Sequence, residues 1–340
     1  MQEADLLVVG GGPVGLVAAI QARLAGLDVV VAEPRTGPID KACGEGLMPG
    51  AVAALAALGV HPEGRAIRGF RYTDGRRSVE HRLRHGAGLG VRRTTLHAAL
   101  AARAAELGVV TVTRKATTVL QTSGAVEAAE VRASWLLACD GLHSPVRRTV
   151  GLDGSRRPGR RFGLRRHFRL EPWTDLVEVH WGRSVELYVT PVGPGLVGVA
   201  VLGPRHTGFD AALAQIPELE ARLIGAQPDG PVRGAGPLRQ SSRARSVGRV
   251  LLVGDASGYV DALTGEGMRV GFAQADAAVA AVIAGDPAAY EREWSARTRD
   301  FRALTGALVA AASSPLRRAI VPTAVAVPGL YGSLIERLAR

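Results

Sequence analysis

Two glycine-containing segments far apart in the sequence place the strongest constraint on the fold of this chain. The first, Asp5-Leu-Leu-Val-Val-Gly10-Gly-Gly-Pro13-Val-Gly15, begins with an apolar run typical of a buried parallel strand. The second, Arg249-Val-Leu-Leu-Val-Gly254-Asp255-Ala-Ser-Gly258, repeats the pattern of an apolar run that ends in glycine. After the first segment, apolar residues at helical spacing and a second apolar run at 29–32 complete a strand–turn–helix–strand unit.

The amino-terminal glycines have the spacing G-x-G-x-x-G, in which each glycine has a physical task. Gly10 permits a tight turn, Gly12 lets the backbone approach a pyrophosphate, and Gly15 allows close packing of helix on strand. The helix that begins near Pro13 then directs free N–H groups and its positive dipole end at the phosphates. The segment therefore predicts a dinucleotide site.

An acidic residue stands where such a site needs one. Glu33 lies at the end of the second apolar run, and a carboxylate there accepts hydrogen bonds from the adenosine ribose. The same carboxylate disfavours a 2′-phosphate at this place. Arg35 follows closely, and we include it in the predicted cofactor site. A glycine turn that binds nothing is the alternative, which the strand, the helix and the acid together disfavour.

Further segments, in order along residues 5 to about 285, resemble the FAD-dependent monooxygenases with the aromatic-hydroxylase fold and their relatives, the geranylgeranyl reductases. Arg93-Thr-Thr-Leu96 is similar to the R-x-x-L motif of that family. Asp140-Gly-Leu-His-Ser144-Pro-Val-Arg147 resembles its D-G motif, and Gly254-Asp255 resembles its G-D motif. Taken singly, Asp140 and Asp255 could each be a turn aspartate after a buried strand.

The resemblance implies that FAD is the cofactor and assigns roles to these residues. Arg93 would approach the FAD pyrophosphate, and Asp255 would bond the ribityl chain. In Thr264-Gly265-Glu266-Gly267-Met268, backbone N–H groups at the start of the next helix would face the flavin N1–C2=O edge. A helix N-terminus stabilises the negative charge that reduced flavin carries there.

One segment points toward the reductase branch. Lys41-Ala-Cys43-Gly-Glu-Gly46 resembles the C-G-G region of geranylgeranyl reductases, where the cysteine lies near the flavin, and T-G-E-G is also more typical of that branch. Those reductases usually carry Y-x-W-x-F-P, whereas this chain reads Leu187-Tyr188-Val-Thr190-Pro191. The W-x-W-x-I-P motif of flavin halogenases is absent as well, and Lys41 does not replace their lysine because it belongs to a different segment.

Composition sets limits on partners and compartment. The net charge is +11, but it comes almost entirely from arginine and no nucleic-acid motif accompanies it, so we expect no nucleic-acid partner. An anionic surface or anionic substrate stays open. We predict a cytoplasmic protein. The chain has only two cysteines, and we find neither a signal peptide nor an unbroken apolar run long enough to span a membrane. We find no metal-ligand spacing.

We predict an α/β fold in which a Rossmann-like FAD-binding domain of the glutathione-reductase type carries an inserted, mostly antiparallel substrate sheet and carboxy-terminal helices. The FAD-binding domain is discontinuous, comprising residues 1–65, 90–155 and 240–300. The inserted domain comprises 66–89, with an Asp74-Gly75 hairpin turn, and 156–239, whose strands alternate in period two. Residues 301–340 form the carboxy-terminal helical segment. Its apolar residues and interleaved arginines fit a helix packed on its own domain, which we favour, or a peripheral membrane contact.

The leading functional hypothesis is an NAD(P)H-dependent monooxygenase that hydroxylates a hydrophobic, aromatic or polyketide-like molecule through a C4a-hydroperoxyflavin. With no second G-x-G-x-x-G, NAD(P)H would bind transiently. The alternative is an ene-reductase in which Cys43 or Glu266 supplies a proton, and a non-catalytic flavin protein is a third hypothesis. Cys43, Glu266 and Lys41 are the catalytic candidates. Cys43 could equally be a packed turn residue, and Glu266 an acid that the helix dipole favours.

Overall fold

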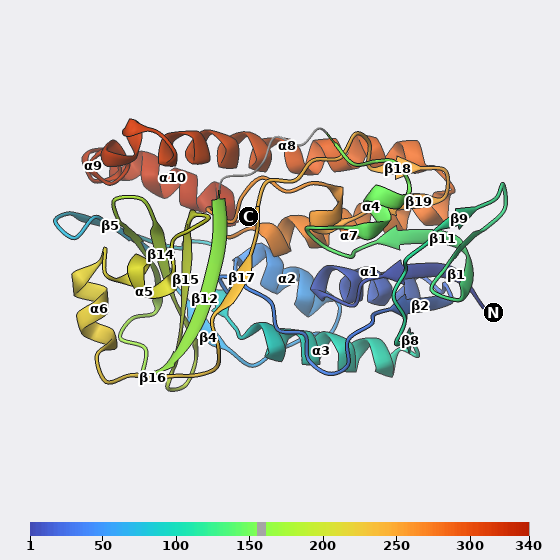
Figure 1. The fold of residues 1–340 in the computed structure, drawn as a ribbon, viewed down its shortest axis with the longest axis horizontal. Helices are drawn as coiled ribbons and strands as arrows, with labels where there is room; N and C mark the ends of the chain where they lie inside the picture. Colours follow the sequence, from blue (N-terminus) through green and yellow to red (C-terminus); the bar gives the residue numbers. More distant parts are fainter. Residues whose placement is uncertain (155–160, 340) are drawn as a thin grey trace.

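The computed structural model describes residues 1–154 and 161–339. The molecule is elongated, with a nucleotide-binding-type lobe that contains the amino terminus and a second lobe built on a large sheet (Figure 1). A small sheet of β3 (Gly46–Leu47), β7 (Gly88–Gly90) and β4 (Arg65–Ile67) lies between them. This confirms the predicted α/β class with an inserted sheet.

The first lobe is organised around a mainly parallel sheet. In spatial order its strands are β18 (Ser246–Val247), β19 (Val250–Leu252), β11 (Val131–Ala138), β1 (Gln2–Val9), β2 (Val29–Ala32) and β8 (Val110–Val112). A short antiparallel extension, β9 (Leu120–Gln121) and β10 (Val126–Ala128), pairs with β11. The two apolar runs that carry the glycine segments, β1 and β19, both flank β11, which brings the two segments to the same edge of the sheet.

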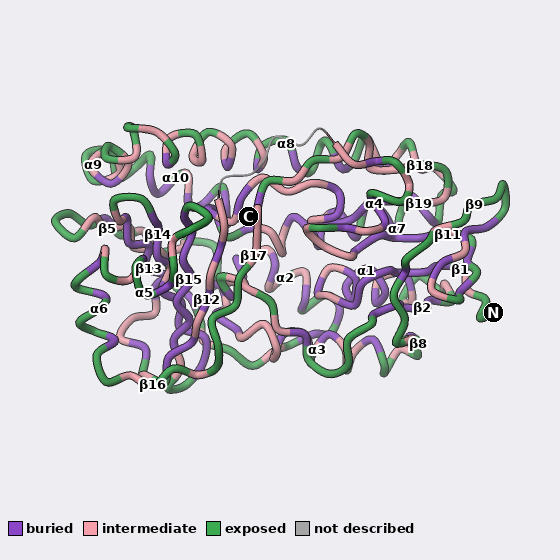
Figure 2. Tube along the Cα trace, in the orientation of Figure 1, coloured by how far each residue is buried: buried purple, intermediate pink, exposed green. Residues whose placement is uncertain are grey.

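Both faces of this sheet are covered at its centre, which explains why β2, β19 and the second half of β1 are continuously apolar. Along β1, Leu6 and Val8 belong to one core and Leu7 and Val9 to the other, as the period of a strand requires. The helices that pack together on the Leu6 face are α1 (Pro13–Leu24), α2 (Pro49–Ala57), α3 (Arg93–Glu106), α7 (Gly267–Ala284) and the first half of α8 (Pro287–Ala312). Figure 2 shows the centre of this sheet as buried, whereas the edge strands β8 and β18 are largely exposed.

The second lobe is built on a sheet to which both inserted segments contribute. Its order is β16 (Gln227–Pro228), β12 (Arg161–Arg169), β15 (Leu196–Pro204), β14 (Glu186–Gly193), β13 (Leu176–Trp181), β5 (Gly69–Thr73) and β6 (Ser78–Arg82), with β17 (Arg233–Ala235) also on β12. All these pairs are antiparallel except β13–β5. The predicted hairpin at 66–89 is present as β5 and β6.

Helices cover the two faces of this sheet from different parts of the chain. The short helices α5 (Phe209–Leu213) and α6 (Pro217–Leu223) pack on one face around Leu187 and Val199. The other face carries the carboxy-terminal segment, which continues from α8 through η2 (Pro315–Ala319), α9 (Ile320–Ala326) and α10 (Pro328–Ala339). In Figure 1, α8 runs along the top of the molecule from one lobe to the other.

The carboxy-terminal segment packs on its own chain, as we favoured. His81 on β6 contacts Glu336 on α10, with Nε2 and Oε1 2.8 Å apart, and the Tyr72 and Tyr331 rings lie 5.0 Å apart. Within the described residues, α7 alone is a single helix long and apolar enough to cross a membrane, and 56% of it is buried inside the molecule. That burial is typical of the core helix of a domain.

Candidate functional site

The first glycine turn has the geometry that the sequence predicts. Gly10 has φ +104°, and a Cβ at that position would lie 2.5 Å from the Cys139 carbonyl oxygen. A Cβ at Gly15 would lie 1.9 Å from the Gly10 carbonyl oxygen, so α1 approaches the turn as closely as only glycine allows. A Cβ at Gly12 would meet only Arg93 Nη2, at 3.8 Å, which leaves open space at the start of α1. Pro13 is the first residue of that helix.

Glu33 is held in place beside this turn. Its Oε2 accepts a hydrogen bond from the Gly11 N–H at 2.9 Å, and Arg35 donates from Nε to Oε1 at 2.7 Å. Burial raises the pKa of the Glu33 carboxyl, but the hydrogen bonds and positive charge of Arg35 and the Gly11 N–H outweigh it and hold that pKa below its usual value. The carboxylate therefore stays ionised, as a ribose-binding acceptor must.

Two cations lie around the open space. The Arg93 guanidinium reaches Met268, with Nη1 3.9 Å from Sδ, and its Nε is buried without a hydrogen-bond partner among the described residues. A Cβ at Gly141 would lie 3.4 Å from Lys41 Nζ. Burial, together with the positive charges of Arg35 and Arg93, lowers the pKa of Lys41, while Asp255 opposes this change. Lys41 thus lies among residues from both ends of the chain.

Arg147, the last residue of the D-G motif, joins the two motifs structurally. This side chain is almost fully buried, donates from Nε to Asp153 Oδ1 at 2.8 Å and from Nη1 to the Ala256 carbonyl oxygen at 3.0 Å. Its second contact lies in η1 (Gly254–Ser257), the turn that contains the G-D motif. The motif arginine therefore supports the site rather than lining it, because its donors are directed at the protein.

The two motif aspartates are partly buried, and Asp140 carries free acceptor capacity. Asp140 Oδ2 accepts from the Val146 N–H at 3.0 Å, whereas Oδ1 is buried and has no partner in the described part of the chain. Burial raises the pKa of Asp140, and it also raises that of Asp255, against the opposing charges of Lys41 and Arg93. Such oxygens match the hydroxyl groups of a bound nucleotide or ribityl chain.

The start of α7 lies next to the G-D turn. Gly265 has φ +71° and Gly267 is the first residue of the helix. From within α7, Gln274 Oε1 accepts from the Gly254 N–H at 2.7 Å, which ties the helix to the turn. The free N–H groups of this helix start are therefore fixed relative to Asp255.

Glu266 is directed into the protein. Its Oε2 pairs with Arg269, whose Nε lies 3.1 Å away, while Oε1 is buried without a partner within residues that the structure describes. Burial raises the pKa of Glu266 to about 7, with Arg269 opposing the shift. The structure shows no contact between this side chain and the other predicted site residues, so its catalytic role stays a prediction.

Cys43 lies on the side of the site that faces the second lobe. Thr190 on β14 donates a 2.9 Å hydrogen bond to the Gly44 carbonyl oxygen, which anchors the Cys43 loop to the large sheet. Tyr259, which follows the G-D turn, lies near Cys43 and covers Gly267, where a Cβ would be 3.5 Å from its ring. Burial raises the pKa of Tyr259, with Asp255, Asp261 and Cys43 adding to the shift. Sequence reasoning missed Tyr259 because no motif singles it out.

Glu45 was also missed. It is 2% exposed, has the left-handed φ of +60°, and its Oε1 accepts from the Arg93 N–H at 2.8 Å. Its Oε2 lies 2.6 Å from His167 Nε2 on β12, and His167 Nδ1 lies 3.0 Å from Arg165 Nη1. Because a guanidinium only donates, Nδ1 accepts and the ring proton is on Nε2, which donates to Glu45. This chain of bonds fixes Arg93 relative to the inserted sheet.

The residues present fit FAD. The open space above Gly12, the unpartnered Arg93 Nε and the unpartnered Asp140 Oδ1 lie where the pyrophosphate and its flanking hydroxyl groups would be held.

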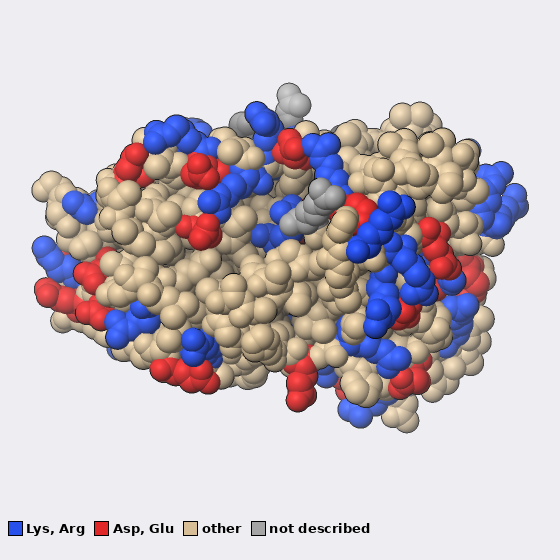
Figure 3. Space-filling model, turned by 180° about the vertical axis from the view of Figure 1, so that it is seen from behind, with Lys and Arg blue, Asp and Glu red and all other residues tan. Residues whose placement is uncertain are grey.

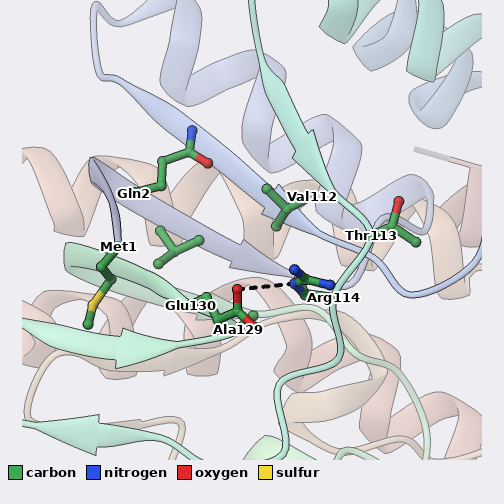
Figure 4. A pocket seen from close by; sticks show the side chains of 8 residues that line it. Met1, Gln2, Val112, Thr113, Arg114, Ala129 and Glu130 are labelled. Carbon is green, nitrogen blue, oxygen red and sulfur yellow. Dashed lines mark ion pairs between the residues drawn. The ribbon is translucent and has the colours of Figure 1, made fainter.

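Another open depression is lined by Met1, Val112, Ala129 and the 3.3 Å Arg114–Glu130 ion pair (Figure 4). None of the predicted cofactor residues lines it. Among the described residues, no group of His, Cys, Asp and Glu could hold a metal ion.

Comparisons with known proteins support an FAD-binding domain. A family model described as an FAD binding domain matches residues 3–164. Menaquinone reductase of Mycolicibacterium smegmatis is 29% identical over 325 residues, which cover 86% of this chain and 79% of that protein. Digeranylgeranylglycerophospholipid reductase of Methanosarcina acetivorans is 28% identical over 331 residues, covering 86% and 81%. The structure of p-nitrophenol 4-monooxygenase from Pseudomonas putida superposes with a TM-score of 0.81 over 100% of this chain and 95% of that one, at 20% identity, which concerns the fold.

Proposed function

We propose that this chain, an FAD-dependent oxidoreductase, reduces a carbon–carbon double bond in a hydrophobic small molecule. NAD(P)H is the proposed electron donor. This reverses the order of our two leading expectations. The reason is that the sequence relatives above are named as reductases, whereas the likeness to a monooxygenase concerns only the fold.

One observation carries this proposal: the Cys43 loop lies beside Tyr259 and the start of α7, on the side that faces the inserted sheet. Saturation of a double bond adds one hydride and one proton. Bound FAD, once reduced, supplies the hydride. The chain must supply the proton, and we assign this role to the Cys43 thiol. Because Cys43 is partly exposed, solvent can return the proton to the thiolate after each turnover.

The surrounding residues position this thiol. The Glu45 N–H lies 3.4 Å from Cys43 Sγ, and Glu45 itself is fixed by His167 and the Arg93 N–H. Tyr188 on β14 donates to the Leu263 carbonyl oxygen at 2.8 Å, so β14 contacts the loops on both sides of the proposed substrate space. This packing limits water and suits an apolar substrate.

The test is anaerobic turnover. FAD-loaded protein, NAD(P)H and a panel of prenylated quinones and isoprenoid alkenes should give a product heavier by two hydrogens. Cys43→Ala should lower turnover about a hundredfold or more and retain its FAD, whereas Cys43→Ser should recover part of the activity. Unchanged turnover in Cys43→Ala would remove the thiol from the mechanism.

Hydroxylation is the second candidate, and the sequence of β14 favours it. This strand reads Leu187-Tyr-Val-Thr-Pro191, without the aromatic residues typical of the reductase branch. A monooxygenase would consume O₂ only when substrate is present and would place an oxygen atom from labelled O₂ in the product. That outcome, together with no anaerobic product, would overturn the reductase proposal in favour of hydroxylation.

A further inference from the structure

The bend between α9 and α10 exposes apolar side chains that the fold does not use. Pro315–Ala326 and Pro328–Ala339 meet at an angle of 102° around Val327. Four large apolar residues of this segment are well exposed, Leu316, Val325, Val327 and Leu330, at 66%, 38%, 48% and 55%. We call these four residues the apolar elbow. Along the sequence they form the densest group of exposed large apolar residues in the described chain.

The residues that flank the elbow are packed on the protein, so the exposed elbow is not a frayed chain terminus. From the same segment, Val321 packs into a core with Trp181, and Tyr331 and Ile335 pack against Val79 on β6. Glu336 also accepts from the Arg84 N–H at 2.9 Å, which adds a second bond to its contact with β6. The inner faces of α9 and α10 are therefore fixed on the sheet, and the elbow must face outward.

Arginines without an ion pair lie near the elbow. Residues 320–335 contain no charged side chain. Next to α9, the β5–β6 turn exposes Arg76 and Arg77, and Arg318 is exposed in η2; within the described chain none of the three side chains has an ion pair. In Figure 3 the upper right of the molecule is a broad area without charged residues, with basic residues at its right edge and both acidic and basic residues below it. Apolar residues flanked by arginines match a bilayer with anionic headgroups.

We propose that the apolar elbow is a peripheral membrane-docking surface, which inserts into the interface of an anionic phospholipid bilayer while Arg76, Arg77 and Arg318 contact the headgroups. The elbow does not span the membrane, because its two helices diverge sharply and their inner faces are already buried in the protein.

The docking surface connects to the FAD site through the interior. Val321 and Ala312 share one core with Leu263, which lies on the loop before α7, and Tyr259 packs against the same core. A lipid-soluble molecule that left the bilayer at the elbow would meet apolar side chains between there and the proposed substrate space. Docking itself does not depend on which reaction the protein performs, so its test is separate from that of the proposed function.

Vesicle flotation tests the proposal. FAD-loaded protein should float with vesicles of equal parts phosphatidylcholine and phosphatidylglycerol, and more weakly with phosphatidylcholine alone. The double variant Val327→Glu/Leu330→Glu should lose at least about tenfold in vesicle partitioning, because two apolar residues are replaced by charges that the anionic surface repels. Arg76→Ser/Arg77→Ser should weaken binding to the anionic vesicles only.

The matched control is Ile224→Glu, which changes another exposed apolar residue, 79% exposed and at the end of α6. It should float like the unchanged protein. FAD absorbance shows that each variant is folded. Protein that does not float, or equal loss in the control and the elbow variant, overturns the proposal. So does a dimer in solution that Val327→Glu/Leu330→Glu converts to monomer, because a second copy would then cover the elbow.

Discussion

Replacement of Glu45 by glutamine tests whether the Arg93–Glu45–His167 chain stabilises the protein as its geometry indicates. The Glu45 carboxylate accepts from two donors, the Arg93 N–H and His167 Nε2–H. The glutamine amide has one oxygen and one NH₂ group. Either the Arg93 N–H or the His167 Nε2–H must therefore face the NH₂ group, which cannot accept a hydrogen bond. The variant thus loses one charge-assisted hydrogen bond and leaves a buried donor unpaired. We expect Glu45→Gln to lower the free energy of unfolding by about 1.5–3 kcal/mol.

Denaturant unfolding of the FAD-loaded protein, followed by flavin and tryptophan fluorescence, measures this change. Glu63→Gln is the matched control, because Glu63 is exposed and has no hydrogen bond or ion pair within the described residues. The control should differ from the unchanged protein by no more than about 0.5 kcal/mol. The reasoning is refuted if Glu45→Gln unfolds at the same denaturant concentration as Glu63→Gln.

Three further predictions concern the cofactor site and its neighbour Glu266. Gly15→Ala should abolish FAD binding, because its Cβ would lie 1.9 Å from the Gly10 carbonyl oxygen; flavin absorbance after purification measures this, and full occupancy would contradict the close approach. Asp255→Ala should weaken FAD binding at least about tenfold, because a charge-assisted hydrogen bond is worth about 1.5–3 kcal/mol; equilibrium titration with FAD measures this. The control is Asp210→Ala, which changes an exposed residue of α5 and should bind FAD as the unchanged protein does. For Glu266 the folded-state pKa of about 7 lies above the ordinary 4.5, so ionisation penalises the folded state. This penalty is absent below pH 4.5 and complete above about pH 7. The free energy of unfolding of the unchanged protein, measured relative to that of Glu266→Gln, should therefore fall by about 3 kcal/mol between these pH values. A difference that does not change with pH would show that Glu266 is not buried in this way.

The cofactor site could be located largely from the sequence because its requirements are local. A turn at Gly10 with positive φ and a helix that must approach the turn at Gly15 are set by residues within a short stretch of chain. The apolar run at residues 6–9, in the second half of β1, already indicated a strand buried on both faces. The comparisons confirm the FAD-binding fold that these motifs predict.

The roles of individual motif residues were less predictable. Arg147 belongs to a recognisable motif, yet its buried guanidinium binds the Ala256 carbonyl oxygen, 109 residues further along the chain. The sequence placed Glu266 beside the flavin, whereas the structure directs its carboxylate at Arg269. A motif records which residue type occurs at a position, but the direction of a side chain depends on the packing around it.

The sequence by itself determined the cofactor class and the α/β architecture, because strand period, glycine spacing and helix starts act over a few residues. Only the tertiary structure decided which distant groups meet. The Glu45–His167 contact joins residues 122 apart and the His81–Glu336 contact joins residues 255 apart. Neither pair has a local signal, because the free energy of each contact is gained only after the sheets have brought both side chains out of water and into reach.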